Sequence, residues 1–296
     1  MSQDWPEWAA GWEAPREKQQ AVVAPLQVAG LRALLDAEED LANPGTPLPI
    51  LWHWVALAAW ARMSETGNDG HPRAGGFMPP APYPRRMWLG TTVDLRGQLL
   101  VGDQVSLERQ VTDIAEKHGV TGTFALVSVT TTVSTTSEVA LTETTRFAYR
   151  AKSSAPAETP AMPGPVAIDT TPWLAHSEHG WLAHPNPVVL ARYSALTANG
   201  HRIHYDLPYA QAVEGYPNLL VHGPLMATVL AEVARRSHAG RECVAFSCRA
   251  LRPYFLGTAA RVQEATSTPA SLDLELHELS PESDSGPYMS ATMKFR

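Results

Sequence analysis

A short run in the second half of the chain combines residue types and spacing that could carry acid–base chemistry. His204 lies five residues after Asn199, and His201 lies between them. An imidazole can exchange a proton near neutral pH without extreme burial, so His204 is the best candidate for a general base or acid. The amide of Asn199 can accept a hydrogen bond from water and donate another, but it cannot act as a base.

A second segment, His222-Gly223-Pro224, opens a long apolar pattern that predicts a helix. The first N–H groups of a helix lack internal partners, and the helix dipole favours negative charge there. Pro224 has no N–H, so the N–H of Gly223 is the natural donor to an oxyanion. Taken alone, Gly223 is better explained as a turn before a helix.

Together the two segments resemble the active site of hotdog-fold enoyl-thioester hydratases of the MaoC type. The common family pattern has Asp where this chain has Asn199, Asn where it has His201 and Pro where it has Arg202. This departure resembles a distinct branch. That branch contains the fungal-type and mitochondrial 3-hydroxyacyl-thioester dehydratases and the mesaconyl-C4-CoA and itaconyl-CoA hydratases.

Further segments carry the same resemblance. Residues 51–54 (Leu-Trp-His-Trp), 69–72 (Asp-Gly-His-Pro) and 84–88 (Pro-Arg-Arg-Met-Trp) look like N-terminal segments of mesaconyl-C4-CoA hydratases. In the second half, residues 214–224 resemble the family as strongly as the run 193–206 does. The resemblance covers most of the chain.

The resemblance implies reversible addition of water to a 2-enoyl thioester. Such a reaction needs water held against the β-carbon, a base, an acid for the α-carbon and donors for the thioester oxygen. We expect His204 to transfer the proton, Asn199 to position water and Gly223 to donate to the oxygen. His201 either shares the proton transfer or serves as a hydrogen-bonding scaffold. No metal or redox cofactor is expected.

Arginines are the candidates for recognising the acyl group. Arg202 stands beside His204, and Arg85 and Arg86 lie in a proline-framed segment. A planar guanidinium can bind a carboxylate in two places at once, which a C4-dicarboxylic acyl group would require. Coenzyme A phosphates also need basic groups, and an ordinary surface or salt-bridged role is the alternative for each arginine. We count His222 and Tyr193 as further pocket candidates, with packing as the alternative for Tyr193.

Other functions remain open at this stage. The runner-up is a (R)-3-hydroxyacyl-thioester dehydratase acting on fatty or polyketide chains, and a hotdog thioesterase or a non-catalytic acyl-binding module comes next. His201, His204 and Asp206 could be taken as a metal site, but the same spacing occurs in the hydratase pattern without a metal. For Asp206 a helix cap is the favoured role.

The elements that must position these residues follow from periodicity. Helices are predicted over 19–42, 187–198 and 224–238, with Asn186 as an N-cap. β-Branched runs with a period of two predict strands over 88–95, 105–115, 122–134 and 139–150, and again over 242–250, 258–266, 271–279 and 287–296. A hairpin turn is expected at 117–119, and the prolines of 79–88 are expected to exclude regular structure.

The order of helices then strands occurs twice, which predicts an α+β fold. With the resemblance, this is a double hotdog in which two antiparallel sheets each wrap a central helix. We expect an N-terminal, non-catalytic hotdog over 1–150, a Pro/Ala-rich linker over 151–172 and a catalytic MaoC-like hotdog over 173–296. One active site per chain follows.

Composition limits the partners. The net charge of −7 over 296 residues gives no basic footprint, so nucleic acid is not an expected partner. With only two cysteines and no signal-like N-terminus, a cytoplasmic location is expected. No run is long and apolar enough to span a membrane. Acyl-CoA, with acyl carrier protein as the other carrier, and a second copy of the chain in a homodimer are the expected partners.

Overall fold

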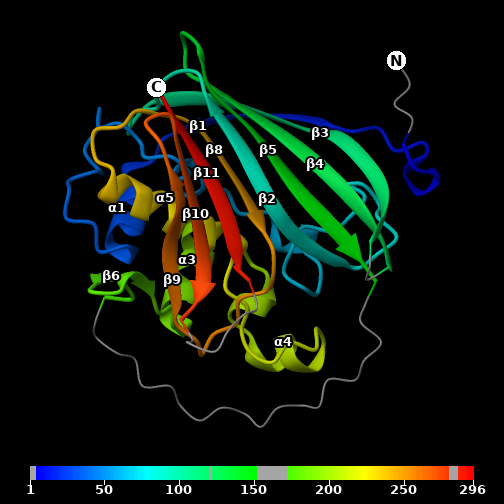
Figure 1. Ribbon diagram of the computed structural model, residues 1–296. Coiled ribbons are helices and arrows are strands. Elements are labelled where there is room, and N and C mark those ends of the chain that lie inside the picture. Colours follow the sequence, from blue (N-terminus) through cyan, green and yellow to red (C-terminus); the bar gives the residue numbers. More distant parts are fainter. Residues whose placement is uncertain (1–4, 120–121, 152–171, 280–285) are drawn as a thin grey trace.

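The computed structural model describes residues 5–119, 122–151, 172–279 and 286–296, and within them the strands form one antiparallel sheet. The eleven strands lie in the order β1-β3-β4-β5-β2-β8-β11-β10-β9-β7-β6 (Figure 1). Their bounds are β1 Arg16–Val22, β2 Arg85–Leu95, β3 Gln104–Gly119, β4 Gly122–Ser134, β5 Val139–Arg150, β6 Leu174–Ser177, β7 Gly180–Ala183, β8 Cys243–Ala250, β9 Ala260–Ser267, β10 Ser271–Glu278 and β11 Met289–Phe295.

The helices lie mainly on one face of this curved sheet (Figure 1). They are α1 Pro25–Leu34, α2 His53–Ala56, α3 Pro187–Leu196, α4 Leu207–Ala212 and α5 Gly223–Ser237, with 3-10 turns at Glu7–Ala9, Met63–Glu65 and Arg202–His204. The longest helix, α5, packs against β10, β11 and β2. Its residues 225–234 are buried on every side, so α5 is the central helix that the C-terminal strands enclose.

Within the described part of the sheet, one strand pair joins the two halves of the chain. Strands β1–β5 come from the first half and β6–β11 from the second, and β2 pairs with β8 from Gly90↔Arg249 to Asp94↔Ala245. The predicted pair of antiparallel sheets is therefore one continuous sheet. The α+β class is confirmed, and the domain boundary at 150 stays a prediction.

Two apolar cores lie under the sheet. The larger core runs continuously through both halves and contains α1, α3 and α5. The far ends of β3, β4 and β5 extend beyond the helices (Figure 1) and have a core of their own. The N-terminal segment, through Ala9 and nearby tryptophans, and the loop around Met78 cover that core.

Most predicted elements are confirmed, with small shifts. The strands of residues 122–150 match, and Asn186 caps α3 by accepting a hydrogen bond from the Val189 N–H at 3.0 Å. Along β4, Val127, Val129 and Val133 are buried, as a period of two requires.

The helix predicted over 19–42 is wrong at its start. Residues 19–22 belong to β1, which pairs with β3, and the helix begins only at Pro25. Pairing with a neighbouring strand outweighs the helical periodicity here, and Pro25 fits the first turn of a helix. The helix also stops early, at Leu34, although the predicted range runs to residue 42.

Two further expectations shift by a few residues. Lys117 and His118 are strand residues of β3 rather than a turn, opposite Phe124 and Thr123. Strand β2 begins at Arg85, inside the segment from which prolines were expected to exclude regular structure. Residues 152–171 of the predicted linker lie outside the described residues. Within the described part of the chain, no helix is long and apolar enough to cross a membrane.

Candidate active site

The turn that follows α3 carries the first candidate residue. After α3 ends, the Asn199 N–H donates to the Ser194 carbonyl at 2.9 Å. The side-chain oxygen of Asn199 then accepts from the backbone N–H of His201 at 3.1 Å. Asn199 thereby fixes the backbone that presents His201. Its predicted role in holding water stays a prediction.

His204 is held in one tautomer by its surroundings. It ends the short 3-10 turn Arg202–His204, and its Nδ1 lies 2.7 Å from the carbonyl oxygen of Leu220. A carbonyl oxygen can only accept, so Nδ1 carries the proton and Nε2 keeps its lone pair. Burial lowers the pKa of His204 to about 3, only partly opposed by the Leu220 carbonyl. At neutral pH the imidazole is therefore neutral, with Nε2 available as a proton acceptor.

His222 stacks on His204 and precedes the central helix. The two ring centroids are 3.6 Å apart, and the planes are nearly parallel. Nε2 of His222 pairs with the Ser194 hydroxyl at 2.8 Å. Nδ1 is buried and has no hydrogen-bond partner among the described residues. Burial, reinforced by the neighbouring histidines His204 and His201, lowers the pKa of His222 well below its usual value.

Gly223 begins α5, so the helix itself makes no use of its N–H. Trp88 of β2 packs directly on this position. A Cβ placed on Gly223 would lie 2.5 Å from Cε3 of Trp88. The N-terminal half therefore covers the start of the central helix, and glycine is the residue that fits beneath the indole.

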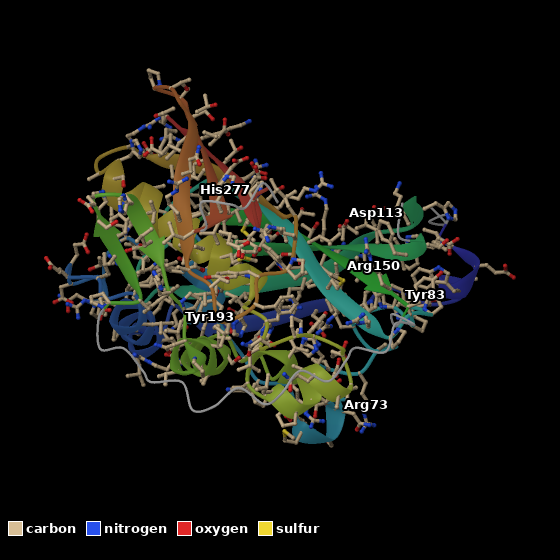
Figure 2. The ribbon with its side chains drawn as sticks, turned by 60° about the horizontal axis from the view of Figure 1, so that its bottom comes forward. Arg73, Tyr83, Asp113, Arg150, Tyr193 and His277 are labelled. Atoms are coloured by element: carbon tan, nitrogen blue, oxygen red, sulfur yellow. The ribbon has the colours of Figure 1, made fainter. Side chains whose placement is uncertain are left out.

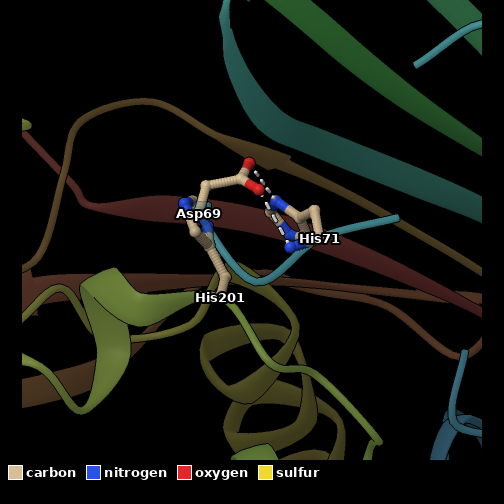
Figure 3. Close-up of side chains that lie close together, drawn as sticks. All are labelled: Asp69, His71 and His201. Atoms are coloured by element: carbon tan, nitrogen blue, oxygen red, sulfur yellow. Dashed lines mark hydrogen bonds and ion pairs between the residues drawn. The ribbon is translucent and has the colours of Figure 1, made fainter. Parts of the chain in front are cut away.

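A loop of the N-terminal half brings two more ionisable residues to this place. Nδ1 of His71 lies 3.2 Å from Oδ2 of Asp69, and the His71 ring lies 4.0 Å from the His201 ring (Figure 3). The His201 ring is in turn 5.6 Å from that of His204. Asp69, His71, His201, His204 and His222 thus form one contiguous group, which we call the histidine cluster.

The charges in the histidine cluster are set by burial and by one hydrogen-bonded pair. Burial raises the pKa of Asp69, but hydrogen bonds and charge from His71 outweigh it and lower that pKa to about 2. Burial, followed by the charge of Arg86, lowers the pKa of His71 to about 4. Burial, with repulsion from His71 and His204, lowers the pKa of His201 to about 2. At pH 7 the cluster therefore holds neutral imidazoles and one ionised carboxylate.

The three predicted arginines differ in how their guanidinium groups are used. Arg202 is paired with Asp206 at 2.7 Å, and Arg85 with Glu214 at 2.9 Å. Arg86 has no carboxylate partner among the described residues; it hydrogen-bonds Tyr149 and lies 5.8 Å above the Phe147 ring.

A cleft of about 660 Å³ opens beside the histidine cluster. Residues of both halves line it, among them Asp69, Arg85, Arg202, Tyr209 and Glu214. Asp206 caps α4 by accepting from the Tyr209 N–H at 3.1 Å, which confirms its predicted role as a cap. The Arg202 guanidinium lies 4.1 Å above the Tyr209 ring, so two residues that line the cleft pack against each other.

The remaining predicted pocket residue, Tyr193, is buried on α3 and lies inside the molecule (Figure 2). Its hydroxyl is 3.2 Å from that of Thr228 on α5, and its ring meets the His222 ring edge-on. These contacts fit the alternative role expected for Tyr193, which is packing inside the protein rather than lining the pocket. Arg73, just after the loop that carries Asp69, is exposed on the surface of the molecule (Figure 2).

Sequence reasoning gave Asp69 and His71 no role, although it singled out residues 69–72 for their resemblance. These two residues and His201 each offer an atom that could bind a metal, all within 4.8 Å of one another. Bound zinc needs nitrogen and oxygen ligands at about 2 Å from the ion. In this structure the His71 Nδ1–H is already engaged, because it donates to Asp69.

Comparison with known proteins identifies what the chain resembles. Residues 51–256 match the family described as hydroxyacyl-thioester dehydratase type 2. A mesaconyl-C(4)-CoA hydratase from Chloroflexus aurantiacus is 37% identical over 254 residues, which cover 86% of each chain.

Solved structures of lower identity share the fold. HtdX of Mycobacterium tuberculosis is 21% identical, with a TM-score of 0.62 over 94% of this chain and 99% of its own. A second protein of that organism, described as having a double hotdog fold, is 14% identical with a TM-score of 0.57 over 98% of each chain. The predicted double-hotdog class is confirmed.

Proposed function

The chain belongs to the hydroxyacyl-thioester dehydratase type 2 family, and from this premise we propose that it adds water reversibly to the double bond of a 2-enoyl-CoA thioester. The observation that carries the proposal is the state of His204. Its Nδ1–H is fixed on the Leu220 carbonyl, its Nε2 has no hydrogen-bond partner among the described residues, and its ring stacks on the residue before Gly223. A proton acceptor and a helix N-terminus therefore face the same small region.

The proposed reaction uses these two groups together. His204 Nε2 takes a proton from water while the water oxygen bonds to the β-carbon. The π electrons move onto the thioester oxygen, where the Gly223 N–H and the positive end of α5 stabilise the charge. Return of the proton from the imidazolium to the α-carbon completes the addition. Dehydration is the same sequence reversed.

We propose a C4-dicarboxylic acyl group of the mesaconyl-C4-CoA kind as the substrate, with itaconyl-CoA of the same chemical class. The Chloroflexus relative named as a mesaconyl-C(4)-CoA hydratase, matched over most of both chains, supports this choice. Arg86 supports it from within the site, because its charge reaches His71 and no carboxylate neutralises it among the described residues. Arg85 and Arg202 are already paired with acidic residues, so their predicted substrate roles need those pairs to open.

The second candidate is a 3-hydroxyacyl-thioester dehydratase acting on unbranched fatty or polyketide chains, which the description of the family favours. It uses the same proton acceptor and the same helix N-terminus. The two functions differ in what binds the far end of the acyl chain, so a comparison of substrates separates them.

The test is the loss of enoyl-thioester absorbance with purified protein, comparing mesaconyl-C4-CoA, crotonyl-CoA and a longer 2-enoyl-CoA. We expect the dicarboxylic thioester to be preferred. In Arg86→Gln, kcat/KM for mesaconyl-C4-CoA should fall about 10- to 100-fold, the range expected for a lost charge-assisted hydrogen bond. Crotonyl-CoA should be nearly unaffected.

Arg146→Gln is the matched control, because Arg146 is an exposed arginine on the neighbouring strand β5. Equal losses on both substrates in Arg86→Gln would remove Arg86 as the specificity residue. Preference of the wild-type protein for unbranched chains would select the second candidate. Silence on all three thioesters would contradict both and return a thioesterase or acyl-binding module to consideration.

The remaining proposals concern the setting of the enzyme. Hydration involves no net oxidation or reduction, so we propose that no redox cofactor takes part. No metal is proposed either, because His204 and the Gly223 N–H can supply the proton acceptor and the charge-stabilising donor. The free cysteines Cys243 and Cys248 fit a reducing, cytoplasmic compartment. Coenzyme A is the proposed carrier, with acyl carrier protein as the alternative. A homodimer is proposed on the analogy of hotdog sheets that pair, and light scattering would test it.

A further inference from the structure

The loop that carries Asp69, residues 67–72, is fixed against the turn of the other half that carries His201. Gly70 has φ +87, and a Cβ on it would collide with the carbonyl of Gly200. The Arg202 N–H donates to the Asp69 carbonyl at 2.9 Å. Only glycine allows this approach of two backbones, so the contact between the halves is a specific feature of the fold.

The loop holds a carboxylate in one defined arrangement. Oδ1 of Asp69 accepts from the His71 backbone N–H at 3.0 Å, and Oδ2 accepts from Nδ1 of the His71 ring at 3.2 Å (Figure 3). With Nδ1–H fixed in this way, His71 presents Nε2 as an acceptor. Its ring then contacts His201, the residue beside the proposed base.

No other carboxylate among the described residues is hydrogen-bonded to a histidine of the cluster. Asp206, the nearest in sequence to His204, is occupied by Arg202 and by the cap of α4. Position 199, where the family's common pattern has a carboxylate, holds Asn. In the part of the chain that the structure describes, Asp69 is therefore the one anion in direct contact with these imidazoles.

We propose that Asp69 and His71, supplied by the N-terminal half, are positioning residues for proton transfer and replace the carboxylate that is absent at position 199. This inference rests on the proposed hydration. When His204 takes the proton from water, a positive charge appears among buried imidazoles. A buried positive charge is costly in free energy, and the negative charge of Asp69, acting through His71 and His201, lowers that free energy. The same contacts keep the two imidazole rings oriented. Asp69 stays ionised throughout, and the proton goes on to the α-carbon of the substrate.

The experiment uses full-length Asp69→Asn, Asp69→Ala and His71→Asn, assayed on the thioester that the wild-type protein hydrates best. We expect kcat to fall about 100-fold in the Asp69 variants, within the range known for groups that assist proton transfer, with KM changed less than about threefold. Because Asp69 lines the cleft, formate should enter the Asp69→Ala protein and restore kcat at least tenfold in a saturable way. Formamide, of similar size but uncharged, should not.

Asp103→Asn is the matched control. Its carboxylate also holds a turn, accepting from the Leu100 N–H at 2.9 Å, and it has no contact with the cluster. Its kcat should equal that of the wild type. Thermal unfolding of every variant separates loss of fold from loss of catalysis, and His71→Asn tests the same pair if Asp69→Ala does not fold.

Three results would overturn the inference while leaving the proposed hydration in place. They are a kcat above half the wild-type value in Asp69→Asn, equal rescue by formate and formamide, and activity that is lost on chelation and returns with Zn²⁺. The last would make Asp69, His71 and His201 metal ligands. A wild-type protein that hydrates no enoyl-CoA would contradict the proposed function itself, and this inference with it.

Discussion

Two buried polar groups of this molecule are both built from histidine and carboxylate, yet they are completed very differently. In the N-terminal half, Glu143 of β5 accepts from His53 at 3.0 Å, Trp54 at 2.9 Å, Thr91 at 2.7 Å and Thr145 at 3.0 Å. Burial raises the pKa of Glu143, but these donors, His53 first, outweigh it and lower the pKa. Each carboxylate oxygen is therefore fully used inside the protein.

The histidine cluster has atoms left over. Nδ1 of His222 is buried without a partner among the described residues, and Nε2 of His204 keeps its lone pair. A buried polar atom without a partner costs about 1–3 kcal/mol, so a site that retains one is expected to use it when substrate is bound. The two groups share histidine and carboxylate. They differ in whether every polar atom has a hydrogen-bond partner, and this difference separates the structural group from the catalytic one.

The largest expected effect comes from the incomplete group. His204→Asn should lower kcat about 100- to 10,000-fold, because the amide cannot accept the proton of water. Stability should change little, since the amide nitrogen of Asn can take the place of Nδ1 and donate to the Leu220 carbonyl. His176→Asn, at an exposed histidine of β6, is the control. The absorbance assay and thermal unfolding measure both effects, and turnover near the wild-type rate would remove His204 as the base.

The complete group should respond in the opposite way. Glu143→Gln leaves one amide oxygen for four donors and turns its NH₂ toward some of them, so the free energy of unfolding should fall by about 3 kcal/mol. The kcat of the folded protein should stay within about twofold. Glu138→Gln, at an exposed turn before β5, is the control for urea unfolding. A large loss of kcat with unchanged stability would mean that the two groups have been assigned the wrong way round.

The smallest effect is a change in the pH dependence of stability. Folding lowers the pKa of His71 from 6.5 to about 4, so below pH 6.5 the unfolded chain binds a proton that the folded chain does not. Stability is therefore complete above pH 6.5 and is lost as pH falls toward 4, by up to about 1.4 kcal/mol per pH unit for each such histidine. Glu143 contributes little above pH 5, because its lowered pKa affects stability only near and below its ordinary value of 4.5.

Urea unfolding between pH 7 and 5 measures that slope. His71→Asn should reduce the slope of the free energy of unfolding against pH by the contribution of one proton, roughly 1.4 kcal/mol per pH unit. His118→Asn, at an exposed histidine of β3, should leave it unchanged. The same slope in both variants would show that His71 is protonated in the folded protein already near neutral pH.

The fold was largely predictable wherever local pattern and tertiary structure agree. The alternation along β4 and the cap and proline at the start of α3 depend on neighbours in sequence, so they appear in the sequence itself. Strand β1 was missed because its partner β3 lies far along the chain, and the short strands β6 and β7 have too few residues to show a period. The pairing of β2 with β8 is not indicated by any pattern in the sequence near either strand.

The site divides in the same way. His204 and Gly223 lie in segments whose residue types already suggest proton transfer and charge stabilisation. Asp69 and His71 reach them only because Gly70 packs on Gly200 from the other half. The sequence around residue 69 gives no indication of that contact with the other half. A turn containing Asp, Gly and His was the available signal, and it predicts a loop more readily than a partner for His201.

The pairing of β2 with β8 also has a consequence for how the chain is made. During synthesis β2 leaves the ribosome together with β3, β4 and β5, but β8 follows only after α3, α4 and α5. At typical elongation rates that interval is on the order of ten seconds, during which the edge of β2 has no neighbour. An unpaired edge invites pairing with other chains. The strand pair that unites the two halves in the finished enzyme is thus the place where the nascent chain is most exposed to aggregation.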